Sequence, residues 1–120
     1  MKTHKDLSIW KESIELTLMI YDEVNLFELD DRITIGKELK RTVVSIPSNI
    51  AEGAARQSDK EFVKFLFYSL GSLSELETQL IIAGRQNILK RKHQLQDAVI
   101  RIRKMILTLI KKIKVRIEQT

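Results

Sequence analysis

The 120-residue chain contains no cysteine, which excludes disulfide bonds, thiolate metal sites and a cysteine nucleophile. It has one proline and four glycines, the two residue types that most often interrupt regular structure. Runs of β-type alternation are few and no long apolar run is present. These absences favour a protein that is helical nearly throughout, and they argue against a membrane span.

The absence of cysteine also suits a reducing compartment. Charges are scattered through the first residues, MKTHKDLSIWKES, so we expect neither a signal peptide nor a membrane anchor there. We therefore predict a cytoplasmic protein. With 43% apolar residues, the chain is long enough for one hydrophobic core and too short for two, so residues 1–120 are predicted to form a single domain.

The only proline lies in residues 41–56, a segment with the apolar period of a helix. Apolar residues in this segment and just before it recur at steps of three and four: Leu39, Val43, Ile46, Ile50 and Ala54. Pro47 removes the N–H that would bond the carbonyl of Val43, at a cost of about 3 kcal/mol in a plain helix. We predict one kinked helix, or two short helices that meet at Ile46.

Polar residues of the same segment also recur at helical steps and so share a face: Arg41, Ser45, Asn49, Glu52 and Arg56. One interpretation is a contact site for a ligand or RNA. The other is a buried structural network, in which Glu52 pairs with Arg56 while Ser45, Ser48 and Asn49 donate to carbonyls near the proline. No histidine, cysteine or second carboxylate joins the stripe, which favours the structural interpretation.

Two motifs, SIPSNIAEG at residues 45–53 and GSLSELETQL at residues 71–80, carry a resemblance to a known family. The chain resembles the small bacterial four-helix bundle proteins encoded by intervening sequences in 23S rRNA genes. The accessory variability determinant of diversity-generating retroelements shares this pattern. The resemblance implies a four-helix bundle, a ring-shaped homopentamer and a nucleic-acid partner, and it implies no defined activity.

The predicted fold is all-α: an antiparallel up-down-up-down four-helix bundle with a Pro-kinked second helix, because short connections make neighbouring helices antiparallel. The predicted helices cover residues 6–26, 32–55, 59–84 and 91–117. Asp6 is expected to cap the first helix, and Asp30 or Asp31 the second. Ser58 and Glu61 have the spacing of a capping box at the third helix.

Apolar residues at steps of three and four predict which face of each helix points to the core. In the first helix they are Leu7, Trp10, Ile14, Thr17, Tyr21 and Val24. In the third helix they are Phe62, Leu66, Ser69, Leu73, Leu76, Leu80 and Ala83. In the fourth helix they are Leu95, Val99, Ile102, Ile106, Leu109 and Ile113. Small residues in the third helix, Ser69, Gly71, Ser72 and Ser74, predict close approach of another backbone.

The first and last helices carry apolar residues beyond these faces. Those residues are Ile9, Leu16 and Ile20, and then Ile100, Met105, Leu107, Ile110 and Ile117. Surplus apolar surface on a polar chain usually marks an interface, so the pattern predicts a homo-oligomer. The pattern alone does not predict the number of subunits; five comes from the family resemblance.

Positive charge is concentrated at one end of the sequence. From residue 85 onward there are eleven Lys or Arg and two acidic residues, a net charge of +9, whereas residues 1–84 carry −4. Phosphate backbones are common partners of such surfaces. The candidate nucleic-acid contacts are Arg101, Arg103, Lys104, Lys111, Lys112 and Lys114. The alternative is a solvated basic face that pairs with acidic residues of other helices or of a neighbouring subunit.

The sequence has no nucleophile beside a base, no metal-ligand set and no glycine-rich phosphate loop, so we predict no enzyme, no cofactor and no metal. Glu75 and Glu77 point in different directions on a helix and are expected to be solvated or salt-bridged. Two hypotheses follow. One is an oligomer that binds RNA or DNA by charge and shape, and the other is a structural or protein–protein interaction bundle without a nucleic-acid role.

Overall fold

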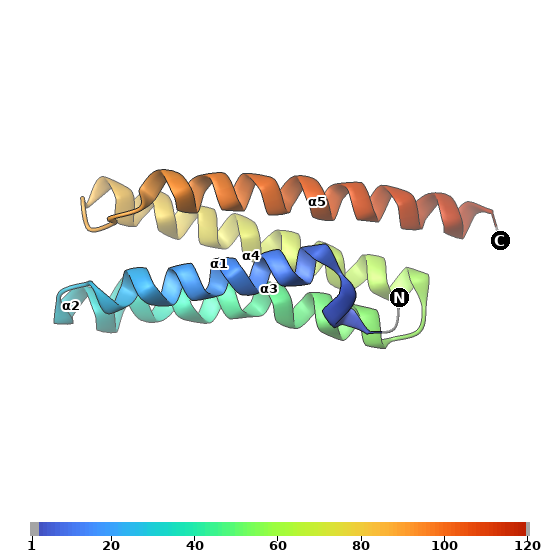
Figure 1. The fold of residues 1–120 in the computed structure, drawn as a ribbon, viewed down its shortest axis with the longest axis horizontal. Coiled ribbons are helices and arrows are strands. Elements are labelled where there is room, and N and C mark those ends of the chain that lie inside the picture. The colour runs from blue at the N-terminus through green and yellow to red at the C-terminus, as the bar shows by residue number, and fades with distance from the viewer. Residues whose placement is uncertain (1–2, 120) are drawn as a thin grey trace.

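A computed structural model describes residues 3–119, and this part of the chain forms helices and no strand. Four long helices run side by side (Figure 1): α1 (Ser8–Asn25), α3 (Lys37–Ala55), α4 (Asp59–Arg85) and α5 (Lys92–Glu118). Helix α1 packs against α3 and α5, and α4 packs against the same two helices. The bundle measures 53 × 20 × 19 Å. The predicted all-α up-down bundle is confirmed.

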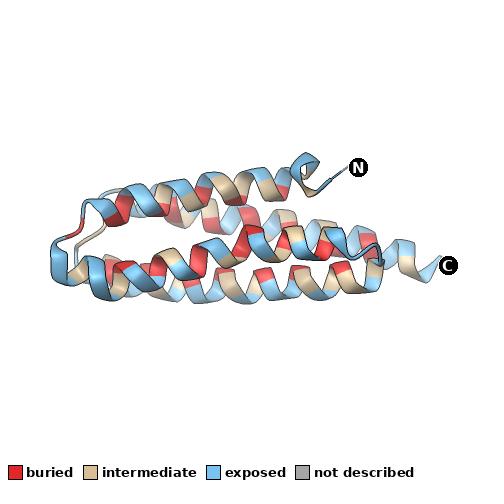
Figure 2. Ribbon diagram, turned by 90° about the horizontal axis from the view of Figure 1, so that it is seen from below, coloured by how far each residue is buried: buried red, intermediate tan, exposed pale blue. Residues whose placement is uncertain are grey.

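Within residues 3–119, no helix combines the length and apolarity that a membrane crossing requires. Figure 2 shows buried residues recurring along each long helix, with exposed residues between them. The core is therefore a continuous strip along the axis of the bundle, built from one face of every long helix.

The first helix begins later than predicted. Asp6 lies in a short 3-10 turn, η1 (His4–Asp6), where its carboxylate accepts the backbone N–H of Thr3 at 3.1 Å. Helix α1 starts only after Leu7, and no side chain caps it. The predicted Asp6 cap is therefore wrong, because Asp6 and Thr3 close the turn that precedes the helix.

The second helix begins earlier than predicted. Asp30 and Asp31 lie inside the short helix α2 (Leu29–Asp31), which continues through the π-helical turn η2 (Arg32–Gly36) into α3. Neither aspartate is a cap, so that prediction is wrong. An acidic residue is stabilised in the first turn by the helix dipole as well as at the cap, and composition alone does not distinguish the two positions.

The predicted core face of the first helix is also wrong. Of its six residues, only Val24 is buried. The buried residues of α1 are Ile9, Ser13, Leu16, Ile20, Glu23 and Val24. The observed face includes two polar side chains, Ser13 and Glu23, which a search for apolar periodicity does not detect. Ser13 is accommodated because its Oγ donates to the carbonyl of Ile9 at 2.7 Å.

This rotation of α1 removes part of the predicted surplus surface. Ile9, Leu16 and Ile20 belong to the core and do not form a second apolar face. In α5, Ile110 is also buried, while Leu109, predicted for the core, is only partly buried. The other five predicted core residues of α5 are confirmed: Leu95, Val99, Ile102, Ile106 and Ile113.

The predicted core face of α4 is confirmed at every position. The helix starts at Asp59, and the Ser58 side chain accepts the backbone N–H of Glu61 at 3.3 Å, as half of the predicted capping box requires. Apolar and small residues recur on this face at steps of four and three without a gap. The sequence pattern was therefore sufficient to identify the buried face of this helix.

Helix α3 runs through Pro47 without interruption, so the alternative of two short helices is wrong. Ser45 Oγ, Ser48 Oγ and Asn49 Nδ2 donate to backbone carbonyls, as predicted. The accepting carbonyls are those of Thr42, Val44 and Ser45. They lie next to or near Val43, whose own carbonyl loses its helical N–H donor to Pro47. From α4, Ser69 Oγ donates to the carbonyl of Ile46 at 2.9 Å.

Helices α3 and α4 approach closely, as the small residues predicted. The hydroxyls of Ser45 and Ser72 are 2.7 Å apart. A Cβ at Gly53 would lie 2.7 Å from the Cβ of Phe65, so glycine is required for this packing. Gly71, by contrast, faces open space and contributes nothing to the approach.

The Glu23 side chain is the one buried carboxylate among the described residues, with 1% of its surface exposed. It accepts the backbone N–H groups of Lys90 and Arg91 and the Nε–H of Arg91, the last at 3.2 Å. These bonds tie the end of α1 to the connection between α4 and α5. The sequence analysis did not identify this role.

We predict that Glu23→Ala lowers the free energy of unfolding by about 2 to 4 kcal/mol, because it leaves buried N–H donors without an acceptor. Urea denaturation at neutral pH measures the change. Glu15→Ala is the matched control, because Glu15 is an exposed glutamate of the same helix, and its effect should stay within about 0.5 kcal/mol. Equal losses in the two variants would contradict the assignment.

Candidate nucleic-acid interface

The arginines of α5 pair with acidic residues of the neighbouring helices. Arg101 pairs with Glu12 of α1, and Arg103 makes two bonds to Glu77 of α4, at 3.2 and 3.3 Å. Two of the six predicted contact residues thus have much of their charge balanced inside the chain. Glu77, expected to be solvated or salt-bridged, is salt-bridged.

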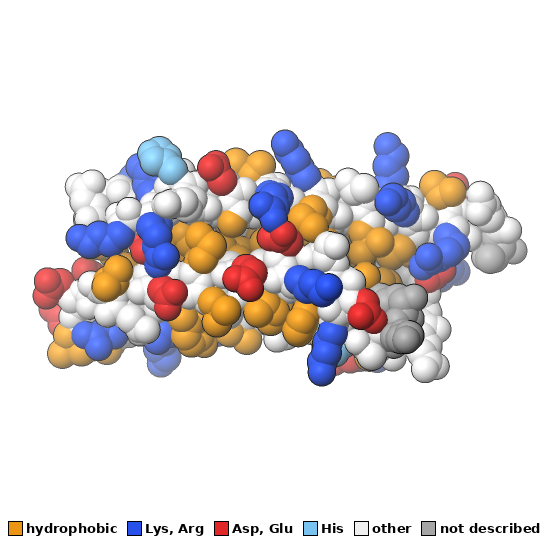
Figure 3. All heavy atoms as spheres, viewed as in Figure 1, with side chains coloured by type: hydrophobic (Ala, Val, Ile, Leu, Met, Phe, Trp, Pro, Cys, Tyr) orange, Lys and Arg blue, Asp and Glu red, His pale blue; other side chains and the backbone are white. Residues whose placement is uncertain are grey.

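The other four predicted contacts are lysines, and all four are exposed: Lys104, Lys111, Lys112 and Lys114. Within residues 3–119, none of them forms an ion pair. Figure 3 shows Lys and Arg side chains along the upper edge of the molecule, which α5 forms. The structure therefore divides these basic residues of α5 into arginines that pair with carboxylates of neighbouring helices and lysines that face solvent without such a partner.

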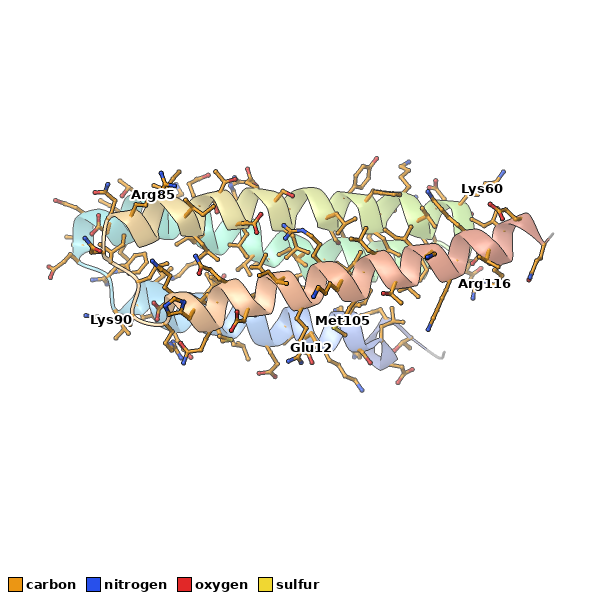
Figure 4. The ribbon with its side chains drawn as sticks, turned by 90° about the horizontal axis from the view of Figure 1, so that it is seen from above. Glu12, Lys60, Arg85, Lys90, Met105 and Arg116 are labelled. Carbon is orange, nitrogen blue, oxygen red and sulfur yellow. The ribbon has the colours of Figure 1, made fainter. Side chains whose placement is uncertain are left out.

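The C-terminal part of α5 lies beside the start of α4. Arg116 donates two hydrogen bonds to Asp59, at 2.7 and 2.9 Å, and Lys114 Nζ lies 5.3 Å from the centroid of the Phe67 ring. The last lysines of α5 are therefore at the same end of the bundle as Lys60. Figure 4 shows Lys60 and Arg116 at this end.

The opposite end of the bundle has mixed charge. Figure 4 shows Arg85 and Lys90 there, and Figure 1 places α2 at the same end. Glu28, Asp30 and Asp31 in and beside α2 supply acidic groups at this end. The basic excess of the sequence is therefore offset at this end of the bundle. It is left largely unbalanced on the C-terminal half of α5.

The polar stripe of α3 lies mainly at the surface. Arg41, Glu52 and Arg56 are exposed, and Ser45 and Asn49 are partly buried, so the expectation of a buried network is wrong. The predicted pair of Glu52 and Arg56 is confirmed at 3.2 Å. The polar side chains that are buried between α3 and α4 are Thr42 of α3 and Ser69 of α4, because each faces the other helix.

Arg41 lies between two acidic residues. It contacts Glu38 at 2.9 Å and Glu75 of α4 at 3.5 Å, and these carboxylates raise the pKa of Arg41 above its ordinary value, chiefly through the hydrogen bond to Glu38. Glu75 also accepts the hydroxyl of Thr42 at 3.2 Å. All charged members of the stripe have partners in the chain, which supports a structural role.

Near Lys104 and Lys112, the start of α1 and the middle of α5 enclose a shallow groove of about 420 Å³. Its apolar lining includes Leu7, Met105 and Leu109. Among residues 3–119, no group of three or more His, Asp or Glu side chains is placed to hold a metal ion. The described part of the chain thus presents basic surface and a shallow apolar groove near Lys104 and Lys112.

Comparison with known proteins supports the family resemblance. The family model described as 23S rRNA-intervening sequence protein matches residues 5–108. A crystal structure of a protein of unknown function from the S23 ribosomal protein family of Bacteroides thetaiotaomicron has a similar fold, with a TM-score of 0.79. The two sequences are 24% identical, and the match covers 86% of this chain and 95% of that chain. No curated protein gives a significant match.

The hydrogen bonds from Arg116 lower the pKa of Asp59 below its ordinary value. A carboxyl whose pKa is lower in the folded chain than in the unfolded chain stabilises the fold at neutral pH, and this stabilisation is lost as the pH falls through the folded pKa. We predict that Asp59→Asn lowers the Tm at neutral pH and has little effect in strong acid. In an Arg116→Gln background, Asp59→Asn should have a much smaller effect at neutral pH; an undiminished effect would exclude the pair as its cause.

Proposed function

The chain belongs to the 23S rRNA-intervening sequence protein family. For this member we propose a non-enzymatic role in which the protein binds nucleic acid through four lysines of α5: Lys104, Lys111, Lys112 and Lys114. The observation that carries the proposal is the division of charge on this helix. Its arginines at positions 101, 103 and 116 pair with acidic residues of α1 and α4. The four predicted contact lysines are exposed and have no such partner among the described residues.

The chemistry of lysine supports contact with phosphates over contact with base edges. An ammonium group is a compact point charge on a flexible stem, so it attracts phosphate without fixing a register. Helix α5 packs against the bundle from Leu95 to Ile113, and its lysines lie on the outward side. Binding through such a surface depends on charge and shape, and sequence preference is expected to be weak.

We predict that Lys104, Lys111 and Lys114 changed together to Gln weaken binding about equally for all nucleic-acid sequences. Each lost phosphate contact should flatten the slope of log affinity against log salt concentration by roughly one unit. Fluorescence anisotropy with labelled RNA and DNA at several salt concentrations measures both quantities. The Tm should change little, because the three side chains are exposed.

The matched control changes Arg85, Lys90 and Lys92 to Gln. These residues are exposed and belong to the same basic segment. Their substitution removes the same amount of charge, but from the opposite end of the bundle. A smaller loss in the control places the contact on the C-terminal half of α5. Equal losses would indicate attraction by net charge alone, and unchanged affinity in both variants would favour the interaction-bundle hypothesis.

A second proposal is self-association through the face where α4 and α5 meet. Ile81 of α4 and Ile100 of α5 are exposed and line the same shallow pocket, and Leu107 is exposed further along α5. Exposed apolar side chains on neighbouring helices are typical of subunit interfaces. A ring of identical contacts would also bring several copies of the α5 lysines together, which strengthens attraction to phosphate.

We predict a mass greater than that of one chain by light scattering at micromolar concentration, with five subunits if the family resemblance extends to assembly. Ile100→Glu combined with Leu107→Glu should reduce the mass, because charge would be buried in the interface. Leu18→Glu is the control, because Leu18 is an exposed leucine on α1. A monomeric wild-type protein would rule out this proposal.

A further inference from the structure

The outer side of α4, in its first half, carries two exposed aromatic side chains. Phe67 is 46% exposed and Tyr68 is 48% exposed, although side chains of this size are normally buried for most of their surface. Gly71 follows one turn later on the same side, and a side chain there would meet nothing within 4 Å. The two rings therefore border a stretch of bare helix. We call Phe67, Tyr68 and Gly71 the α4 ledge.

Positive charge lies over one ring of the ledge and over the ring beside it. Lys114 of α5 lies over Phe67, with 5.3 Å between Nζ and the ring centroid. Tyr68 makes an edge-to-face contact with Phe65, with ring centroids 5.2 Å apart. Two further cations lie over the Phe65 ring: Arg56 at 4.9 Å and Lys64 at 5.8 Å.

The acidic side chains closest to the ledge in sequence are already engaged. Glu75 lies 3.5 Å from Arg41, and Glu61 lies 3.7 Å from Lys64. No acidic residue occurs between Glu61 and Glu75, so the ledge itself carries no negative charge. Exposed aromatic rings beside cations, without opposing carboxylates, match the two surfaces of a nucleic-acid strand, which are flat bases and charged phosphates.

We propose that the α4 ledge is a stacking platform for the bases of single-stranded nucleic acid. The proposal rests on the proposed function and names its substrate class. Every base has a π-face that can stack on Phe67 or Tyr68, whatever its sequence, while the strand's phosphates reach Lys114 and the other lysines of α5. In a duplex these faces are covered by neighbouring base pairs, so the ledge distinguishes single strands from double strands.

The contact between Lys114 and Phe67 makes the ledge continuous with the lysine surface of α5. A single strand can therefore follow one surface from α5 onto α4. A protein partner would have to bury both the lysines and the rings, and burying unpaired lysine charges is unfavourable. At this end of the bundle the charge thus favours a polyanion with aromatic groups over a second protein chain. The self-association proposed above uses Ile81 and Ile100, which lie toward the opposite end.

The test compares two labelled single strands of about 12 nucleotides, within the range that single-strand-binding sites cover. One is oligothymidylate and the other is an abasic deoxyribose-phosphate chain of the same length and charge. We expect wild-type protein to bind oligothymidylate more tightly than the abasic chain and more tightly than a duplex. Tyr68→Ala should lower affinity for oligothymidylate by about fivefold to a hundredfold and leave affinity for the abasic chain unchanged.

Three variants sharpen the comparison. Tyr68→Phe keeps the ring and should bind oligothymidylate as the wild type does, whereas Phe67→Leu keeps apolar bulk without a ring and should lose affinity for it. Leu18→Ala removes an equally exposed apolar side chain from α1 and should change nothing. The salt slope should stay constant in all three, because no phosphate contact is removed.

The inference is overturned if Tyr68→Ala weakens both strands equally, if wild-type protein prefers the duplex, or if the aromatic variants change the oligomer mass and so place the rings in a subunit interface. Its failure can be told apart from that of the proposed function. If the lysine variant loses affinity and the aromatic variants do not, lysine binding stands and stacking fails. If wild-type protein binds neither strand at low salt, both fail.

Discussion

The Glu23 carboxylate is removed from water at the end of the bundle where α1 meets the connection between α4 and α5. Burying a charge is costly unless hydrogen-bond donors surround it. Its donors are two backbone N–H groups and one guanidinium N–H of this connection, so the connection has one favourable position relative to α1. Because α5 begins directly afterwards, the same bonds help to set which of its residues face the core and which face solvent.

The side of α5 that faces solvent is then divided by the geometry of its cations. The planar guanidinium group matches a carboxylate with two hydrogen bonds, which lysine cannot do. Arg103 and Arg116 each make such a pair of hydrogen bonds, to Glu77 and Asp59 of α4. The lysines on the C-terminal half of the helix remain at the surface, where their charge is available to a ligand. The helix can therefore combine a structural role with a binding role without using the same side chains for both.

Sequence patterns were sufficient where one type of side chain marks the core. The core face of α4 was predicted at every position, and α5 was wrong only at Leu109 and Ile110. On α1 the core face includes Ser13 and Glu23, which are buried because their polar atoms find partners. An apolar period cannot include such residues, so the predicted face was rotated toward Trp10 and Tyr21. The predicted surplus at Ile9, Leu16 and Ile20 was a consequence of this error.

By itself, the sequence determined the number and approximate ends of the long helices, the antiparallel order, the capping by Ser58 and the excess of positive charge after residue 85. These follow from local periods, short connections and composition, which do not depend on distant contacts. Only the tertiary structure decided which charges remain unpaired, because Glu12 and Arg101 are 89 residues apart and meet only when α1 packs on α5. It also decided that Phe67 and Tyr68 face solvent beside Lys114, since the exposure of a ring depends on how closely the neighbouring helices cover it.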